Sequence, residues 1–305
     1  MNKNDQLPNF LIVGMAKCGT SSLSKYLQQH PEVFISRQKE PRFITSQFMD
    51  FPLNGPKDDQ VEAWYVKNYE QYAQLFKDAT QKAIGEASAD TLYFHQGSIP
   101  VIKQYFGDPK IIIILRNPVN RAFSAYQHLV RDQREPLSFE EALAREPERI
   151  KNNWELIYHY QAVSHYTEPV RAFKENFSQV KVIFNEDLQR TPNAVLQEVL
   201  QFLGVDDSFN FDDSLRHNVS GKPRNQLLHQ ILWSENAIRA AVRPLVKLVL
   251  PTKAMRQKLH SKIMANNLER QHIDENTRQK LKTLFTPDVR ALEKLLDCDL
   301  SKKFF

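Results

Sequence analysis

Five short apolar runs occur along the chain and alternate with longer amphipathic stretches. The clearest run, residues 111–115, reads Ile-Ile-Ile-Ile-Leu. An uninterrupted apolar run of this kind is typical of a strand buried on both faces of a parallel sheet. On the same pattern we expect strands over residues 10–13, 33–35, 82–85, 111–115 and 180–184.

Helical periodicity fills the intervals between these runs. We expect helices over residues 21–29, 61–76, 120–131, 139–145, 170–176 and 193–203. The alternation of strands and helices predicts an α/β fold, with a central parallel sheet flanked by helices on both faces. The C-terminal third lacks strand signals and is expected to be helical. No linker divides the chain, so we expect a single domain over residues 1–305.

Composition is that of an ordinary globular protein. The 305 residues are 41% hydrophobic and 25% charged, which is enough to bury a substantial core. The N-terminal residues are polar, and no apolar signal region or transmembrane run is present in the sequence. The two cysteines, Cys18 and Cys298, lack metal-ligand spacing and fit a reduced setting. We therefore expect a cytoplasmic protein.

Charge is unevenly distributed. Residues 216–262 contain ten Lys and Arg and one acid, a net +9, so the rest of the chain carries −4 of the total +5. Such a segment indicates an anionic partner, or only a solvated helix face. Within it, Arg239, Arg243 and Lys247 recur every four residues among apolar positions. This spacing fits a helix packed on the protein's own core, or one that makes peripheral contact with an anionic membrane.

The most informative stretch is residues 10–22, where an apolar run leads through a glycine loop into a helix. Gly14 and Gly19, with four residues between them, open the pattern of a nucleotide-triphosphate loop. Thr20 then stands where that pattern requires lysine, and the loop's own lysine is Lys17. A strand, a glycine loop and a helix N-terminus form a phosphate cradle. This cradle lacks the lysine that would reach a γ-phosphate.

Two further segments combine cations with loop or helix-start signals. Arg116 is the first residue after the 111–115 strand, Pro118 suits a first helical turn, and Ser124 lies eight residues beyond Arg116. An arginine fork with a hydroxyl one or two turns on would make a second phosphate site, and an ion pair at a strand end is the alternative. A later loop, either a phosphate-binding loop or a basic surface turn, contains Ser220, Gly221, Lys222 and Arg224.

Together these segments resemble the sulfotransferases that use 3′-phosphoadenosine-5′-phosphosulfate (PAPS), of the bacterial and heparan-sulfate-modifying type. The first loop matches that family's 5′-phosphosulfate loop, Arg116 and Ser124 match its 3′-phosphate motif, and residues 220–224 resemble its late basic loop. Residues 185–188 and the tail from 286 to 300 also resemble the family. The resemblance implies a P-loop-like three-layer fold, PAPS as the donor and PAP as the product. The implied nucleotide-binding residues are Lys17, Cys18, Gly19, Thr20, Ser21, Ser22, Arg116, Ser124, Ser220, Gly221, Lys222 and Arg224.

The resemblance also implies a reaction. A sulfuryl group would pass to a hydroxyl or amine acceptor, expected on a carbohydrate or a lipid-linked molecule. Lys17 would stabilise the bridging and sulfuryl oxygens. Glu40, in a segment similar to the family's Glu-x-x-Phe-Phe, would deprotonate the acceptor, and His128, in a Tyr-Gln-His segment, is the other candidate base. The departing nucleotide is a good leaving group, so no metal is expected, and nothing indicates a nucleic-acid partner.

The chain departs from the family pattern at two positions. Asn185 stands where the family often has a tyrosine near the adenine. Ala87 follows Glu86 where the heparan-modifying enzymes have a lysine that contacts the reaction centre. More of the positive charge at that centre then has to come from Lys17.

Two other classes of function stay open on the sequence. A P-loop kinase-like phosphotransferase would use a similar loop, but Thr20 counts against it and the Arg116–Ser124 pair would have no natural ligand. A basic binding protein, with no catalytic role, would hold an acidic polymer or a membrane through residues 216–262.

Overall fold

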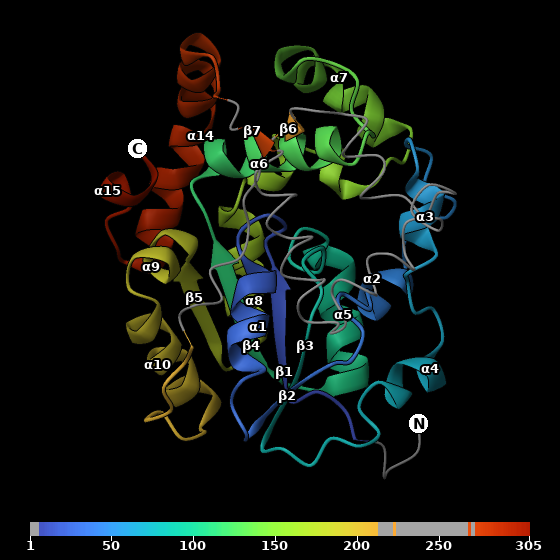
Figure 1. Cartoon of the computed structure of the whole chain (residues 1–305), viewed down its shortest axis with the longest axis vertical. Helices are drawn as coiled ribbons and strands as arrows, with labels where there is room; N and C mark the ends of the chain where they lie inside the picture. The colour runs from blue at the N-terminus through green and yellow to red at the C-terminus, as the bar shows by residue number, and fades with distance from the viewer. Residues whose placement is uncertain (1–5, 213–221, 224–267, 270–271) are drawn as a thin grey trace, which may run out of the picture.

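The computed structural model describes residues 6–212, 222–223, 268–269 and 272–305. Its centre is a five-stranded sheet in the order β2-β3-β1-β4-β5, and every neighbouring pair of strands is parallel (Figure 1). The strands are β1 (Phe10–Gly14), β2 (Val33–Ile35), β3 (Ala83–Ala87), β4 (Lys110–Leu115) and β5 (Val180–Phe184). The predicted α/β class and parallel sheet are confirmed.

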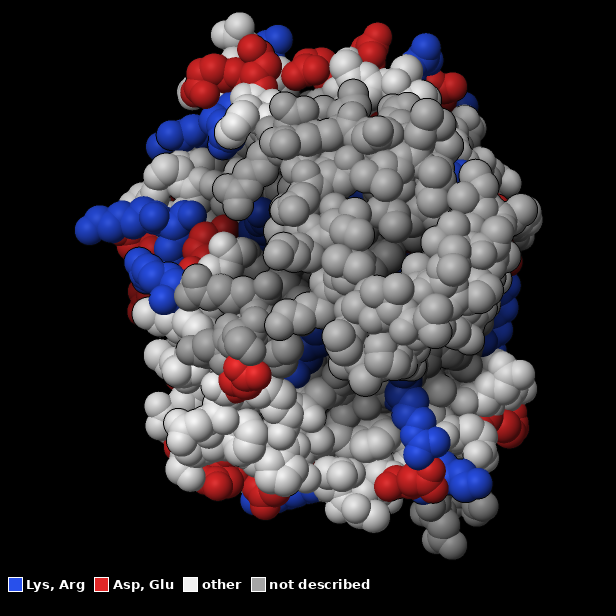
Figure 2. Space-filling view, viewed as in Figure 1, with Lys and Arg blue, Asp and Glu red and all other residues white. Residues whose placement is uncertain are grey.

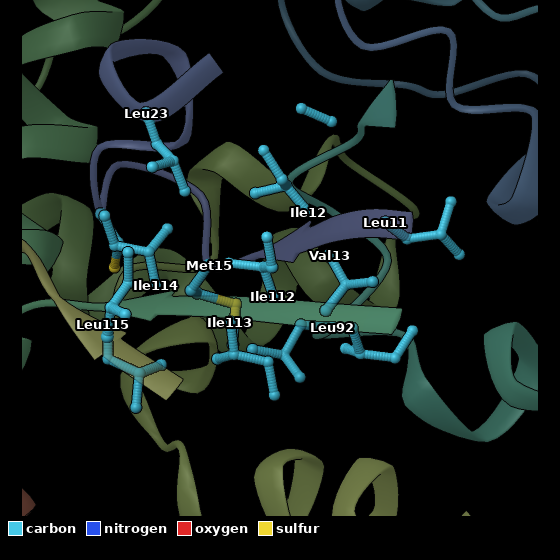
Figure 3. Close-up of a cluster of buried hydrophobic side chains, with 14 of the residues drawn as sticks. Leu11, Ile12, Val13, Met15, Leu23, Leu92, Ile112, Ile113, Ile114 and Leu115 are labelled. Carbon is cyan, nitrogen blue, oxygen red and sulfur yellow. The ribbon is translucent and has the colours of Figure 1, made fainter. Parts of the chain in front are cut away.

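The middle of the sheet is deeply buried. Every side chain from Ile111 to Leu115 in β4 is 0% exposed. Helices cover both faces of this strand, which is why its sequence is continuously apolar instead of alternating. Figure 3 shows residues 112–115 of this strand in one cluster with Leu11, Ile12 and Val13 of β1 and with Met15 and Leu23. Burial of each such side chain stabilises the fold by about 1.5–3 kcal/mol.

Helices occupy both faces of the sheet. Helix α1 lies in front of the sheet in Figure 1, while α5 and α8 pack against each other, as right-handed crossovers require. The helices of residues 6–212 are α1 (Thr20–Leu27), α2 (Phe43–Ser46), α3 (Asp58–Glu62), α4 (Tyr69–Gln74), α5 (His95–Phe106), α6 (Pro118–Arg131), α7 (Phe139–Lys151), α8 (Thr167–Asn176), α9 (Asn185–Arg190) and α10 (Pro192–Leu203). Among the described residues, no helix is long and apolar enough to cross a membrane.

The expected helix over residues 61–76 is wrong, because the structure has two short helices, α3 and α4, in that region. The backbone N–H of Val66 donates to the carbonyl oxygen of Pro41 at 2.9 Å, which takes it out of a helical ladder. Asn68 then starts α4, and its side chain accepts from the backbone N–H of Gln71. A tertiary hydrogen bond and a new cap therefore override the local periodicity.

The sequence analysis also did not predict helix α5 or the strand pair β6–β7. Helix α5 contains Gly97 and Pro100, which weaken the helical signal of its sequence, although Ile99 and Ile102 bury its apolar face. In the C-terminal third, β6 (Lys222–Pro223) pairs antiparallel with β7 (Leu268–Glu269), so the expectation of helix without strand is wrong there. Two residues a strand are too few to leave a pattern in the sequence.

The C-terminal helices dock on the sheet assembly through α8 and α6. Helix α14 (Glu275–Leu296) places Asp288 at the start of α8, where its carboxylate accepts from the backbone N–H groups of Tyr166 at 2.8 Å and Thr167 at 3.2 Å. Beyond it, α15 (Ser301–Phe304) brings the carbonyl oxygen of Phe304 to the side-chain amide of Asn117. The tail thus reaches the segment that follows β4.

Replacement Asp288→Ala is expected to lower the free energy of unfolding by about 2–3 kcal/mol, because two backbone N–H groups lose a charged acceptor. Urea unfolding followed by circular dichroism measures the change. Lys280→Ala, at an exposed position on the same helix, is the matched control and is expected to stay within about 0.5 kcal/mol. Equal stability of the two variants would contradict the anchoring role of Asp288.

Candidate functional site

A cavity of about 740 Å³ opens at the carboxyl ends of the central strands. Ligands bind at this edge in open parallel sheets. Residues from several separate segments line it: Ala16, Lys17, Gly19, Thr20, Ser21, Ser22, Tyr26, Lys39, Glu40, Arg42, Ala89, Asp90, Arg116, Ser124, His128, Arg131, Glu155, Leu156, Ile157, Asn185, Leu188, Gln189 and Pro192. The two phosphate motifs and both candidate bases predicted from the sequence therefore face one space.

The glycine loop forms one wall of the cavity. Gly19 is the N-cap of α1 at φ 106°, and no side chain caps this helix end in the described part of the chain. The first-turn N–H groups at Thr20 and Ser21 therefore face the cavity with the positive end of the helix dipole behind them. This arrangement is suited to an anion.

The segment after β4 lies directly against that loop. Arg116 donates from Nη1 to the carbonyl oxygen of Lys17 at 3.2 Å. Ser124 lines the same cavity from α6, two turns beyond Arg116. The backbone N–H of Asn117 donates to Glu186 at 2.9 Å, which fixes the start of α6. The structure thus brings the two predicted anion sites side by side.

Lys17 is the loop's only lysine and one of the cations that line the cavity. Its backbone is held at φ 68°, in the left-handed region. Burial and the nearby Arg131 guanidinium lower the pKa of the Lys17 ammonium to about 8. A cation that is desolvated and repelled in this way is stabilised when an anion binds beside it.

Glu40 lies across the cavity at φ 50°, between two cations. Arg42 donates from Nη2 to its carboxylate at 3.2 Å, and Lys39 lies 3.3 Å from the other carboxylate oxygen. Burial alone would raise the pKa of the Glu40 carboxyl, but Arg42 and Lys39 outweigh it and hold the pKa below its ordinary value. Glu40 is therefore ionised at neutral pH and can accept a proton.

A chain of buried ion pairs supports Glu40 from behind. Arg42 also contacts Glu155 at 3.1 Å and the Tyr65 hydroxyl at 3.1 Å. Glu155 in turn lies 2.9 Å from Arg134, which pairs with Asp58. Sequence reasoning missed this chain, because its members come from four segments and no spacing connects them.

His128 is held by its neighbours in the neutral form. Its Nδ1 accepts from Arg131 Nη2 at 2.6 Å, so Nδ1 carries no proton, and its Nε2 lies 3.5 Å from Asp132. Burial and the charge of Lys17 lower the pKa of the His128 imidazole well below its ordinary value. The lone pair that a base would use is engaged by Arg131 in this arrangement. Geometry therefore favours Glu40 over His128 as the base.

The two departures from the family pattern have structural counterparts. Ala87 ends β3, is 6% exposed and is absent from the cavity wall. Glu86 beside it is buried, accepts from the Ser88 hydroxyl at 2.8 Å, and burial raises the pKa of its carboxyl to about 8. Asn185 does line the cavity and packs against Gly19. The cavity wall therefore has the amide of Asn185 at the position where the family often has a tyrosine near the adenine.

Several predicted site residues are not in the cavity wall or cannot be placed. Cys18 is fully buried near the Tyr166 hydroxyl, and burial raises the pKa of its thiol to about 12, which leaves it an unreactive part of the loop. Lys222 pairs with Glu269 through the backbone of β6 and β7. The remaining predictions lie outside the described residues: Ser220, Gly221, Arg224, Arg239, Arg243 and Lys247.

The face of the molecule drawn in Figure 2 carries both acidic and basic side chains. Acidic side chains gather along the upper edge in Figure 2, over α14 and α7.

Among residues that the structure describes, no cluster of three or more His, Cys, Asp or Glu side chains is arranged to hold a metal ion.

Comparison with known proteins defines the class. The profile of the Sulfotransferase family matches residues 8–209, which include the whole parallel sheet and all five strand-end segments. The chain therefore belongs to the sulfotransferase family.

Individual relatives agree with this assignment. The chain is similar to a sulfotransferase from Alicyclobacillus acidocaldarius of known crystal structure, with 34% identity, a TM-score of 0.77 and coverage of 97% of this chain and 98% of that one. It is 36% identical over 152 residues to the membrane-associated sulfotransferase kil1 of Dictyostelium discoideum. The matched region covers 48% of this chain and 29% of the relative. It is 30% identical over 218 residues to the mouse (Mus musculus) bifunctional heparan sulfate N-deacetylase/N-sulfotransferase 3, covering 69% of this chain and 24% of the relative. The chain thus spans under a third of the length of these two relatives.

Replacement Gly19→Ala is expected to weaken binding of PAP at least tenfold, because the new methyl group would clash with the Asn185 amide at a position with φ 106°. Gly107→Ala is the matched control, since Gly107 also has a positive φ, 73°, but has no atom within 4 Å of the added carbon. Calorimetric titration with PAP compares the two, and equal losses would mean that backbone strain alone is responsible.

Proposed function

We propose that the protein transfers a sulfuryl group from PAPS to a hydroxyl or amine acceptor. The observation that carries this proposal is the contact between Arg116 and the Lys17 carbonyl, which sets two anion sites against each other in one cavity. A nucleotide with one phosphate on each side of its ribose has this pattern of charge. A kinase is less well supported, because Thr20 follows Gly19 where a γ-phosphate would need lysine.

Each residue of the cavity has a role in this reaction. The first turn of α1 would hold the 5′-phosphate, and Arg116 with Ser124 would hold the 3′-phosphate. PAPS supplies the activated sulfuryl group when bound. Glu40 accepts the proton of the acceptor as its oxygen or nitrogen bonds to sulfur, and Lys17 stabilises the charge that develops on the departing bridge oxygen.

The acceptor class rests on relatives and is the less specific part of the proposal. A carbohydrate is supported by the heparan sulfate N-deacetylase/N-sulfotransferase similarity, and a lipid-linked or membrane-borne acceptor by the name of the Dictyostelium relative. We propose a glycan or glycolipid, with peripheral membrane contact through residues 216–262 as part of the same hypothesis.

Replacement Glu40→Gln is expected to lower kcat about 1000-fold with little change in PAP affinity, since it removes the proton acceptor and keeps the shape of the side chain. The assay is transfer of labelled sulfate from PAPS to a panel of glycan, lipid, phenol and amine acceptors. Glu175→Gln, at an exposed position on α8, is the control and is expected to turn over normally. Normal turnover by Glu40→Gln would assign the base to His128 instead.

PAPS affinity is expected to be constant at low pH and to weaken as the pH rises above about 8, the pKa of Lys17 in the free protein. Below that pH the ammonium is charged and attracts the donor. Above it, binding must be accompanied by uptake of a proton, which costs up to about tenfold in affinity per pH unit. Titration of PAPS over this range measures the slope, and the Lys17→Met variant is expected to lose it. An unchanged slope in that variant would exclude Lys17 as the titrating group.

A further inference from the structure

Arg131 shares the cavity with Lys17 although no motif in the sequence marks it. Both side chains line the cavity, and Arg131 is the strongest cationic neighbour acting on the Lys17 ammonium. Glu40 and Asp132 act on the Lys17 ammonium in the opposite direction, and burial is the largest cause of its lowered pKa. Two cations held close together in a partly desolvated space create a site whose energy falls when an anion enters.

The position of Arg131 along α6 relates it to the nucleotide site. Ser124, His128 and Arg131 follow an i, i+4, i+7 spacing, and all three line the cavity. Seven residues of helix extend about 10 Å. Ser124 lies at the 3′-phosphate end of the proposed nucleotide site, so Arg131 lies two turns further along the same helix face. Lys17, which also lines the cavity, is near enough to interact electrostatically with both Arg131 and Glu40.

The guanidinium of Arg131 is oriented by its neighbours. Its Nε donates to Asp132 at 2.9 Å, and its Nη2 donates to His128 Nδ1 at 2.6 Å. These contacts restrict the rotation of a long side chain that is 22% exposed. A guanidinium held in this way keeps a permanent positive charge at a fixed place on the cavity wall.

We propose that Arg131 contacts the sulfuryl oxygens of the donor and shares with Lys17 the charge that develops during transfer, and that His128 is a positioning residue for Arg131. The inference rests on the proposed PAPS-dependent function. In the step, the acceptor bonds to sulfur, the bond from sulfur to the 5′-phosphate oxygen breaks, PAP leaves with the electron pair, and Glu40 takes the acceptor's proton. Arg131 thereby supplies a positive charge that Ala87, at the end of β3, does not.

The test compares PAPS with PAP, because the two ligands differ only by the sulfuryl group. Arg131→Gln is expected to weaken PAPS binding at least tenfold, to leave PAP binding within about threefold, and to lower kcat about 100-fold. His128→Asn is expected to reduce the ratio of PAPS to PAP affinity in the same direction but less. Arg145→Gln, an exposed arginine paired with Glu148 on α7, is the control and should change neither affinity.

Arg131→Lys keeps the charge and guards against loss of folding in the glutamine variant. It is expected to retain most of the PAPS affinity while losing part of kcat, since a point charge replaces the fork. Equal weakening of PAPS and PAP by Arg131→Gln, or weakening of neither, would overturn the assignment while wild-type transfer leaves the proposed function standing. Failure of the wild-type protein to bind either nucleotide would overturn both.

Discussion

The hydrogen bond from Arg116 to the carbonyl oxygen of Lys17 is the contact on which the site depends. It joins the loop after β1 to the segment after β4, and these two strands are neighbours at the centre of the sheet. Each loop follows a strand that is held rigidly in the core. The positions of Arg116 and Lys17 relative to each other are therefore well defined. An anion on one side of it is therefore at a fixed distance from an anion on the other.

Charged side chains of both signs line the cavity. Cations from α6 and the first loop, Lys17 and Arg131, face the region proposed for the sulfuryl group. The carboxylate of Glu40 lies opposite, and its ionisation is maintained by Arg42. Arg42 is itself held by Glu155 and the Tyr65 hydroxyl. Removal of one member of such a chain leaves an unpaired buried charge, which is costlier than the chain itself.

Sequence reasoning found what local patterns encode. Continuous apolar residues predict the β-strands. The rule that ligands bind at the carboxyl ends of parallel strands is then enough to group Lys17, Arg116 and Ser124. Partners that lie far apart in the chain left no such signal. Arg131 ends a helix like many surface arginines, and only the structure shows it beside Lys17. The break between α3 and α4 likewise depends on a hydrogen bond to Pro41, 25 residues away from Val66.

Lys17, Glu40 and Arg42 all have backbone conformations with positive φ, and all three line the cavity. For residues other than glycine, such conformations cost on the order of 1–3 kcal/mol each. The protein therefore holds these three cavity-lining residues in place at the expense of its own stability. A selection for greater heat resistance, applied without a demand for turnover, would favour glycine or asparagine at these positions and would yield a more durable but inactive protein.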